Sequence, residues 1–144
     1  MLGNEEIVKK WIRAFAADVP NEIIKNNVTA SCNFLWHVFG WGKESYLQGD
    51  DARKALDALP PKQKCILFFN GYSVRGKNII EDVSLIANKL SSLQIDELQE
   101  KQDFSKQDIY LVEQNFKWTY VITHESDCGP YFCKEVVITF DDEV

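Results

Sequence analysis

The residues with the greatest capacity for chemistry lie near the end of this chain, in the segment WTYVITHESDCGPYFC over positions 118–133. This segment contains His124, Glu125, Cys128 and Cys133. A cysteine close to a histidine can act as a nucleophile when a third group orients the imidazole, and Glu125 or Asp127 is placed to do so. The signature of a known cysteine hydrolase is absent, so these residue types alone do not identify a reaction.

The same segment offers metal ligands. Zinc prefers imidazole nitrogen and thiolate sulfur, which His124, Cys128 and Cys133 would supply, with His37 or Cys32 as a fourth ligand. The spacings His-x3-Cys and Cys-x4-Cys are not those of a standard zinc knuckle. Cysteine is also common in protein cores simply as a small apolar side chain. We therefore expect no cofactor, with zinc at these residues as the alternative.

Both histidines of the chain also have a purely structural interpretation. His124 follows a strand pattern and can bond a backbone carbonyl, which would hold the next turn in place. Glu125 is its neighbour, and adjacent strand residues point to opposite faces, so the two converge only if the strand has ended. His37 lies between Leu35 and Phe39, where we expect a hydrogen-bonded core histidine.

Four aromatic residues form a second candidate group, as the wall of a ligand pocket or a partner surface: Trp36, Trp41, Trp118 and Tyr120. Ligand pockets are mostly apolar, but core packing explains most large rings first. Trp41 differs because glycines flank it on both sides. A large ring on a turn is often exposed enough to anchor a partner.

A hairpin is the clearest element that would position these residues. Alternating apolar residues predict strands over Ile109–Glu113 and Lys117–Thr123, joined by residues 114–116. Trp118 and Tyr120 would then point to the same face of the second strand. The last residues of this second strand lead directly to His124 and Glu125.

Other strands are predicted over Cys32–Phe39, Cys65–Asn70 and Tyr131–Phe140. The first two have apolar residues on both faces, which is typical of interior strands covered on both sides. The window Ile79–Leu90 fits a helix or a strand and stays open. A polar helical turn is predicted over Asp96–Gln102.

Helices are predicted at two places. Asn4 can cap a helix that ends before Pro20, and Gly49 precedes a helix that ends before Pro60. With a length of 144 residues and a hydrophobic fraction of 45%, the chain fits one domain with its own core. We predict a single α+β domain over residues 1–144, in which helices pack on a mixed, mostly antiparallel sheet.

Composition excludes several classes of protein. No apolar run approaches the ~20 residues of a membrane helix, so we expect no membrane association. The N-terminus MLGNEE lacks the basic start and apolar stretch of a signal peptide, so we expect a cytoplasmic protein. In that compartment the four cysteines are expected to be thiols.

The net charge of −6 is unevenly distributed. Residues 1–72 hold nine Lys/Arg and eight Asp/Glu, a sum of +1, whereas residues 73–144 hold seven and fourteen, a sum of −7. An acidic half repels nucleic-acid phosphates, so we expect no nucleic-acid binding. It would attract a basic protein, although solubility alone also accounts for such a charge.

Two aromatic blocks that each contain a histidine carry a family resemblance. They are LWHVF at 35–39 and WTYVITHE at 118–125, the second followed by CGPYF at 128–132. With these blocks the chain resembles a small bacterial family, a domain of unknown function of about this length, mostly from Gram-positive species. The likeness covers most of the chain. It implies no activity and no catalytic residues, because none are assigned to that family.

The sequence favours a non-catalytic binding or regulatory module over an enzyme. One concrete form is an inhibitor of a basic toxin or nuclease, as immunity proteins are. One alternative is a metal-binding or Cys/His-dependent enzyme centred on His124, Cys128 and Cys133. Another is a small-molecule sensor with a pocket walled by the aromatic group.

Overall fold

The computed structural model of this chain describes residues 4–28, 35–40, 43, 45–60, 65–69, 80–81, 108–123, 125 and 128–136, and the account below concerns these residues. It shows an antiparallel sheet with helices on both faces, which confirms the predicted α+β class. In the described part of the chain, no helix has the length and apolar character needed to cross a membrane.

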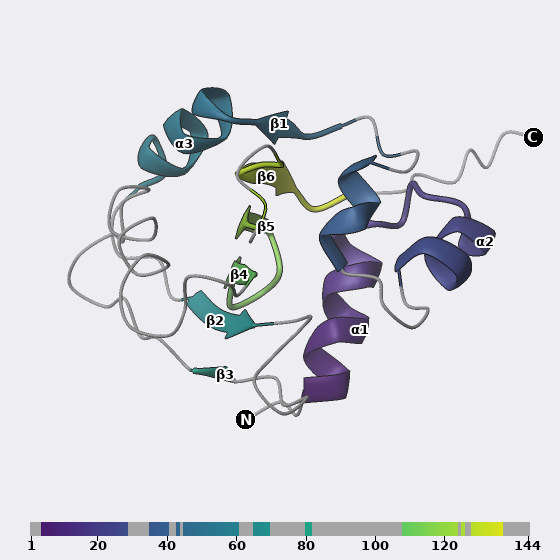
Figure 1. The fold of residues 1–144 in the computed structure, drawn as a ribbon. Helices are drawn as coiled ribbons and strands as arrows, with labels where there is room; N and C mark the ends of the chain where they lie inside the picture. The colour runs from purple at the N-terminus through teal and green to yellow at the C-terminus, as the bar shows by residue number, and fades with distance from the viewer. Residues whose placement is uncertain are drawn as a thin grey trace, which may run out of the picture.

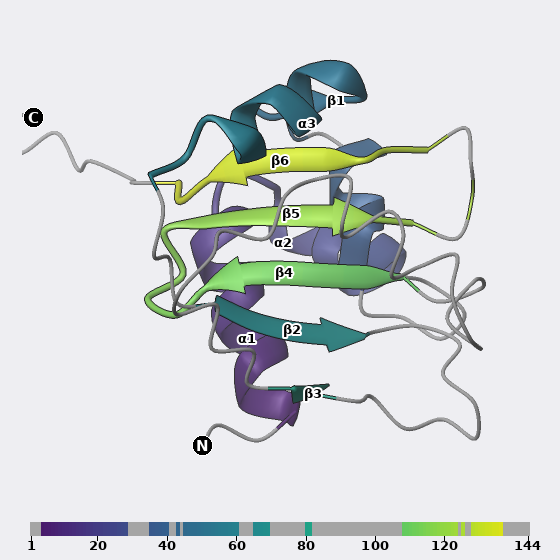
Figure 2. The same cartoon turned by 90° about the vertical axis from the view of Figure 1, so that its left-hand side faces the viewer.

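Six strands form one sheet in the order β1-β6-β5-β4-β2-β3 (Figure 1). Every neighbouring pair is antiparallel. The bounds are Leu47–Gln48 for β1, Cys65–Phe69 for β2, Ile80–Glu81 for β3, Ile109–Glu113 for β4, Trp118–Ile122 for β5 and Tyr131–Lys134 for β6. The longer strands occupy the middle of the sheet, and the two-residue strands β1 and β3 form its edges (Figure 2).

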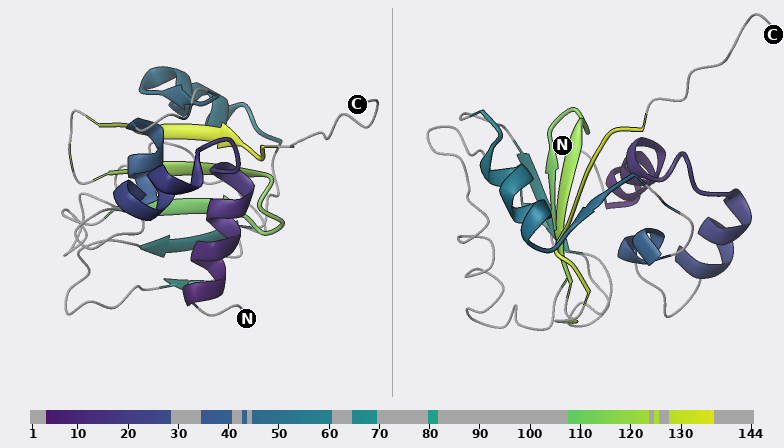
Figure 3. Two further views of the ribbon diagram at one scale, coloured as in Figure 1. Left: turned by 90° about the vertical axis from the view of Figure 1, so that its right-hand side faces the viewer. Right: turned by 90° about the horizontal axis from the view of Figure 1, so that it is seen from above.

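The helices divide between the two faces of the sheet (Figure 3). Their bounds are Asn4–Phe15 for α1, Asn21–Ile23 for α2 and Asp50–Asp57 for α3. A π-helical turn, Ile24–Val28, continues α2, and a 3-10 helix spans Leu35–Gly40. α1, α2 and the 3-10 helix lie on one face, which we call the α1 face, and α3 lies on the other, the α3 face.

α1 packs on the sheet because its apolar residues recur at helical spacing. Ile7, Trp11 and Phe15 are at most 1% exposed. Together with the 3-10 helix they pack on the strand residues that point to the α1 face: Tyr110, Val112, Val121, Tyr131 and Cys133. Figure 3 shows α1 running across the strands, so one helix contacts several of them.

α3 covers the opposite face of the same strands. Its buried residues are Ala52 and Leu56. They belong to a core that contains the alternate strand residues: Cys65, Ile109, Leu111, Trp118, Tyr120, Ile122 and Phe132. Successive strand residues point to opposite faces, so each central strand contributes to both cores. As predicted, Trp118 and Tyr120 share one face.

The predicted hairpin is confirmed by β4, β5 and the link at 114–116. The link holds Phe116 at a φ of 60°, a backbone region that bulky residues rarely adopt. The helices predicted from Asn4 and Gly49 are confirmed by α1 and α3. The strand predicted over Cys65–Asn70 is confirmed by β2, although its last residue lies outside the described residues.

The strand predicted over Cys32–Phe39 is wrong. Its described part belongs to the 3-10 helix Leu35–Gly40, in which Leu35, Trp36, Val38 and Phe39 are all buried. A short apolar run does not distinguish a strand covered on both sides from a buried helical turn. The backbone N–H of Trp36 donates to the Tyr110 hydroxyl at 3.0 Å, which anchors this turn on the sheet.

The last strand is shorter than predicted. Of the range Tyr131–Phe140, β6 contains four residues, and the chain then leaves the sheet. The Val136 N–H donates to the carbonyl of Ala14 in α1 at 2.7 Å. This backbone group is therefore bonded to a helix and not to a neighbouring strand. Residues 71–76, 96–102 and 137–140 lie outside the described part. So does the open window Ile79–Leu90, apart from the two residues of β3.

Candidate functional site

Tyr131, the first residue of β6, is the centre of a group of rings on the α1 face. Its ring stacks on Phe39 with centroids 4.5 Å apart and on Trp36 at 6.5 Å, and Tyr46 meets it edge-on at 5.7 Å. The Cys128 thiol lies close enough to the Tyr131 hydroxyl to raise the pKa of that hydroxyl. We call these five residues the thiol–aromatic cluster. The 3-10 helix and the connection between β5 and β6 therefore meet at one point.

Thr123 holds that connection in place. Its buried hydroxyl lies within hydrogen-bond distance of the carbonyl oxygens of Glu125, at 2.8 Å, and Cys128, and it accepts a bond from the Glu125 N–H at 3.3 Å. This role was predicted for His124, which lies outside the described residues. Thr123 was missed because a threonine at the end of a strand is an ordinary strand residue.

Gly129 brings the chain back towards β6. Its φ is 91°, and the Gly129–Pro130 peptide bond is cis. A Cβ at position 129 would lie 3.3 Å from the Tyr131 ring, so glycine suits both the backbone conformation and the close approach. The Pro130 carbonyl accepts a bond from the Gly49 N–H at 2.8 Å, which joins this turn to the start of α3.

The Tyr131 hydroxyl of the cluster favours its neutral state. The pKa of the Tyr131 hydroxyl is raised to about 12, first by burial and then by Cys128, Tyr46 and Glu125. The Cys128 thiol donates to Glu125 Oε2 at 3.5 Å. This carboxylate repels the negative charge that a thiolate would carry. The described part of the cluster therefore lacks the positive environment that activates a cysteine nucleophile.

The other two described thiols are buried on opposite faces of the sheet. Cys133 is on the α1 face, where burial raises its pKa to about 12, with Lys43 lowering it and Asp18 raising it. Cys65 is on the α3 face, and its pKa is also raised to about 12, by burial and then by Glu113. Both are protonated at neutral pH, so they pack as small apolar side chains.

The metal alternative stays a prediction. Of its ligands, His124 and Cys32 lie outside the described residues, whereas Cys128 and Cys133 are described. Among the described side chains, no three of His, Cys, Asp and Glu are arranged to hold one ion. Glu125 contacts the Cys128 thiol, whereas Cys133 is buried.

His37 is half-buried on the 3-10 helix, so its predicted setting on an interior strand is wrong. Its ring meets that of Trp36 edge-on, with centroids 4.6 Å apart. Because Trp36 in turn stacks on Tyr131, His37 lies at the border of the thiol–aromatic cluster.

The aromatic residues proposed as a pocket wall are divided between the two faces. Trp36 belongs to the α1 face, whereas Trp118 and Tyr120 belong to the α3 face. There Trp118 stacks on Phe132 with centroids 6.0 Å apart. The sheet lies between these groups, so the three rings do not line one cavity. Trp41 lies outside the described residues.

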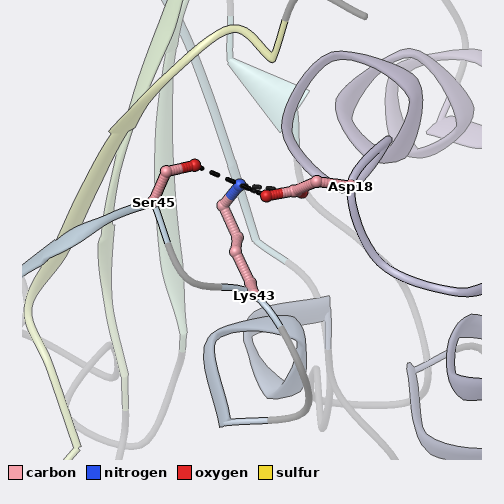
Figure 4. A network of polar contacts seen from close by, with 3 residues as sticks. All are labelled: Asp18, Lys43 and Ser45. Atoms are coloured by element: carbon pink, nitrogen blue, oxygen red, sulfur yellow. Dashed lines mark hydrogen bonds and ion pairs between the residues drawn. The ribbon is translucent and has the colours of Figure 1, made fainter.

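A buried lysine is the feature that sequence reasoning missed. The Lys43 side chain is 0% exposed, and its Nζ lies 3.1 and 3.2 Å from the two carboxylate oxygens of Asp18 (Figure 4). The Ser45 hydroxyl donates to Asp18 Oδ2 at 3.4 Å. A buried cation is costly unless it is paired, and this carboxylate supplies the pair. The surrounding sequence GWGKES contains no signal of burial.

Comparison with known proteins gives a family but no described activity. The model of a family described as a domain of unknown function (DUF4275) matches residues 4–132. No curated protein and no solved structure matches the chain.

Proposed function

Because the chain belongs to the DUF4275 family, whose function is unknown, we propose a role from its own residues: it is a non-catalytic binding protein whose partner is a basic protein. The uneven charge carries this proposal. Residues 73–144 have a net charge of −7, and residues 1–72 have +1. An excess of negative charge raises the rate at which a basic partner is encountered.

The state of the candidate reactive groups supports a non-catalytic role. The pKa of Cys65 and that of Cys133 are both raised to about 12, so neither is a thiolate at neutral pH. The rings of Trp118 and Tyr120 are used in the core of the α3 face. Catalytic cysteines need an electropositive, partly exposed position, which differs from these settings.

An inhibitor of a basic toxin or nuclease, of the kind that immunity proteins are, is the concrete form of this proposal. Such a partner must bind nucleic acid or a similar polyanion, so it presents a positive surface. An acidic protein can cover that surface directly. Tight complexes of this kind combine fast, charge-steered association with a small set of buried contacts.

A pull-down tests the proposal. The immobilised chain is exposed to lysate at about 10 mM salt, where the Debye length is ~30 Å, and at about 150 mM, where it is ~8 Å. We expect a basic protein to be retained, with association that slows as salt rises. If no basic protein is retained at the lower salt, the proposal fails.

Matched charge variants locate the interaction. The triple variant Asp141→Asn, Asp142→Asn, Glu143→Gln removes three charges from the acidic half. The control Glu6→Gln, Glu22→Gln, Asp51→Asn removes three exposed charges from the other half. We expect the first to slow association by about tenfold and the second by less than about twofold. Equal effects would show that only total charge matters, which contradicts a defined partner surface.

A second candidate function is a metal-binding or Cys/His-dependent centre at His124, Cys128 and Cys133. One observation favours it: Cys128 is half-buried rather than buried, and it lies 3.5 Å from a carboxylate oxygen of Glu125. A thiol and a carboxylate on one short connection can bind the same ion. Cys133 would contribute only after losing a proton with a pKa of about 12.

Elemental analysis and alkylation distinguish these forms of the second candidate. Stoichiometric zinc in protein purified without a histidine tag, lost in Cys128→Ser, would support the metal centre. Alkylation of Cys128 that is faster than that of a free thiol near pH 7 would support the nucleophile. Neither result is expected if the chain is a binding protein.

A further inference from the structure

A groove with a volume of about 320 Å³ lies between α1 and the β4–β5 turn. α1 lines it with Lys10, Arg13 and Ala14, the turn lines it with residues 114–116, and Glu135 lies after β6. This volume is at the lower end for small-ligand sites and suits one or two amino-acid side chains rather than a large cofactor.

Backbone hydrogen bonds between its walls make the groove preformed. The Val136 N–H donates to the Ala14 carbonyl at 2.7 Å, and the Glu135 N–H donates to the Lys117 carbonyl at 2.8 Å. The side chains of Lys117 and Glu135 are paired at 3.1 Å. Three separate parts of the chain are therefore fixed relative to one another, which reduces the entropy lost when a ligand binds.

The turn that lines the groove is held in one conformation. Glu113 Oε1 accepts bonds from the backbone N–H groups of Asn115, at 3.0 Å, and Lys117, at 3.2 Å. Phe116 keeps its φ of 60° and buries its ring, which is 6% exposed. Lys10 Nζ lies 5.9 Å from the centre of that ring, so the ring helps to hold an ammonium group at the groove.

The groove is positive on a negative protein. Among the residues that line the groove, Lys10 and Arg13 contribute two positive charges and Glu135 one negative charge, a local sum of +1 on a chain of −6. Arg13 is exposed, and within the described part of the chain its guanidinium has no hydrogen-bond or ion-pair partner. An exposed arginine that lines a preformed groove is available to an anionic ligand.

We propose that this groove binds a carboxylate of an acidic peptide segment. The guanidinium fork of Arg13 matches the two oxygens of a carboxylate, and Lys10 adds a second cation. The side-chain amides of Gln114 and Asn115 are suited to backbone groups of a peptide. Glu135 can accept a peptide N–H, and its negative charge repels a phosphate dianion more strongly than a singly charged carboxylate. This site goes beyond the basic partner proposed above, because it selects the opposite charge.

Binding to a defined peptide tests the site. The probe is an N-acetylated, C-amidated peptide with three consecutive glutamates between glycines, compared with the same peptide containing glutamines. Calorimetry with the full chain is expected to show binding of the glutamate peptide only. In NMR spectra the backbone amides of Asn115 and Lys117 should shift on binding. Equal binding of the glutamine peptide, or tighter binding of inorganic phosphate, would overturn the proposal.

Single variants assign the binding to the groove. Arg13→Ala is expected to weaken binding by about tenfold, the loss typical of one charge-assisted hydrogen bond. Lys25→Ala removes an exposed cation from the π-helical turn, outside the groove, and should change binding by less than about twofold. Glu135→Gln should strengthen binding, because it removes the negative charge. If Arg13→Ala and Lys25→Ala weaken binding equally, the peptide responds to overall charge and the assignment is wrong.

Discussion

The two faces of the sheet bury large side chains by different means. On the α1 face, Trp11 Nε1 donates to Thr119 Oγ1 at 3.0 Å, and this hydroxyl donates to the Leu111 carbonyl at 2.8 Å. The Tyr110 hydroxyl accepts a further bond from the backbone N–H of Trp36. The core of the α3 face is formed by apolar contacts of α3 with the sheet. Directional bonds specify one arrangement, whereas apolar contacts tolerate repacking.

The candidate sites described above all lie on the α1 side of the molecule. The thiol–aromatic cluster packs on the core of the α1 face, the pair of Lys43 and Asp18 borders it, and the groove is lined by α1. A side of the molecule whose side chains are held by directional hydrogen bonds suits recognition, because binding groups must be held within a fraction of an ångström. We infer that the side chains of the α1 face are held in one arrangement more strictly than those of the α3 face. The predictions below test this inference.

The largest expected effect is on α1 itself. Trp11→Ala removes a fully buried ring and its bond to Thr119, and we expect it to lower the free energy of unfolding by about 4 kcal/mol. Leu56→Ala on the α3 face should cost about 3 kcal/mol. The milder Trp11→Phe should cost about 2 kcal/mol, since it keeps most of the ring and loses the bond.

Urea denaturation of the three variants and the wild type measures these values. A larger cost for Leu56→Ala than for Trp11→Ala would reverse the comparison between the faces. A cost near zero for Trp11→Phe would show that the indole hydrogen bond contributes little.

The ion pair on the α1 side should respond unequally to the loss of each partner. Asp18→Asn leaves a Lys43 ammonium that is 0% exposed, whereas Lys43→Met leaves an Asp18 carboxylate that is 29% exposed. We expect the first to cost about 3 kcal/mol and the second about 1 kcal/mol, because the unpaired charge is more costly when it is fully buried. Thermal or urea unfolding measures both.

A surface pair on α3 supplies the control. Arg53 and Asp50 are paired at 2.9 Å, with side chains 39% and 83% exposed. Arg53→Ala should change the free energy of unfolding by less than about 0.5 kcal/mol. Equal costs for Asp18→Asn and Lys43→Met would contradict the explanation by burial.

Alkaline pH should destabilise the protein through its buried thiols. The pKa of Cys133 is about 12 in the folded state and 9.0 for an ordinary cysteine. Because the folded value is the higher one, this stabilisation is complete below pH 9 and is lost as the pH rises from 9 towards 12. Between pH 7.5 and 10.5 the loss attributable to Cys133 is about 2 kcal/mol.

The readout is the change in unfolding free energy between these two pH values, rather than the stability of each variant at neutral pH. Cys133→Ala should show a drop about 2 kcal/mol smaller than the wild type. Cys65→Ala should differ in the same direction, since its pKa is also raised to about 12. A drop in Cys133→Ala as large as in the wild type would show that its thiol does not titrate differently on folding.

The sequence predicted the parts of the fold that repeat a periodic pattern. α1 and the β4–β5 hairpin follow from regular spacing of apolar residues, and α3 follows from a glycine and two aspartates before an apolar stripe. The 3-10 helix Leu35–Gly40 was missed because its residues are apolar throughout. Burial on all sides removes the periodicity from which a helix or a strand is identified.

The sequence indicated only those parts of the candidate site that are formed by residues close together in the chain. The connection around Cys128 was identified as a turn, and Glu125 and Cys128 are in contact there. The pairing of Lys43 with Asp18, 25 positions away, depends on how α1 ends and on where the 3-10 helix packs. Nor does spacing predict that Trp36 and Trp118 lie on opposite faces, because the first is not on a strand.

A smaller effect than that of the buried thiols is expected at the turn that supports the thiol–aromatic cluster. Gly129→Ala places a side chain at a φ of 91° and a Cβ 3.3 Å from the Tyr131 ring. We expect a cost of about 1.5 kcal/mol from the backbone conformation, and a weaker near-UV circular dichroism signal as the ring shifts. Gly40→Ala is the matched control on the same face, because a Cβ there would meet nothing within 4 Å. It should be neutral or slightly stabilising, since alanine restricts the unfolded chain. If both variants leave stability and the aromatic signal unchanged, this turn does not fix the arrangement of the cluster. The side chains of the α1 face are then held less strictly than their ring contacts indicate.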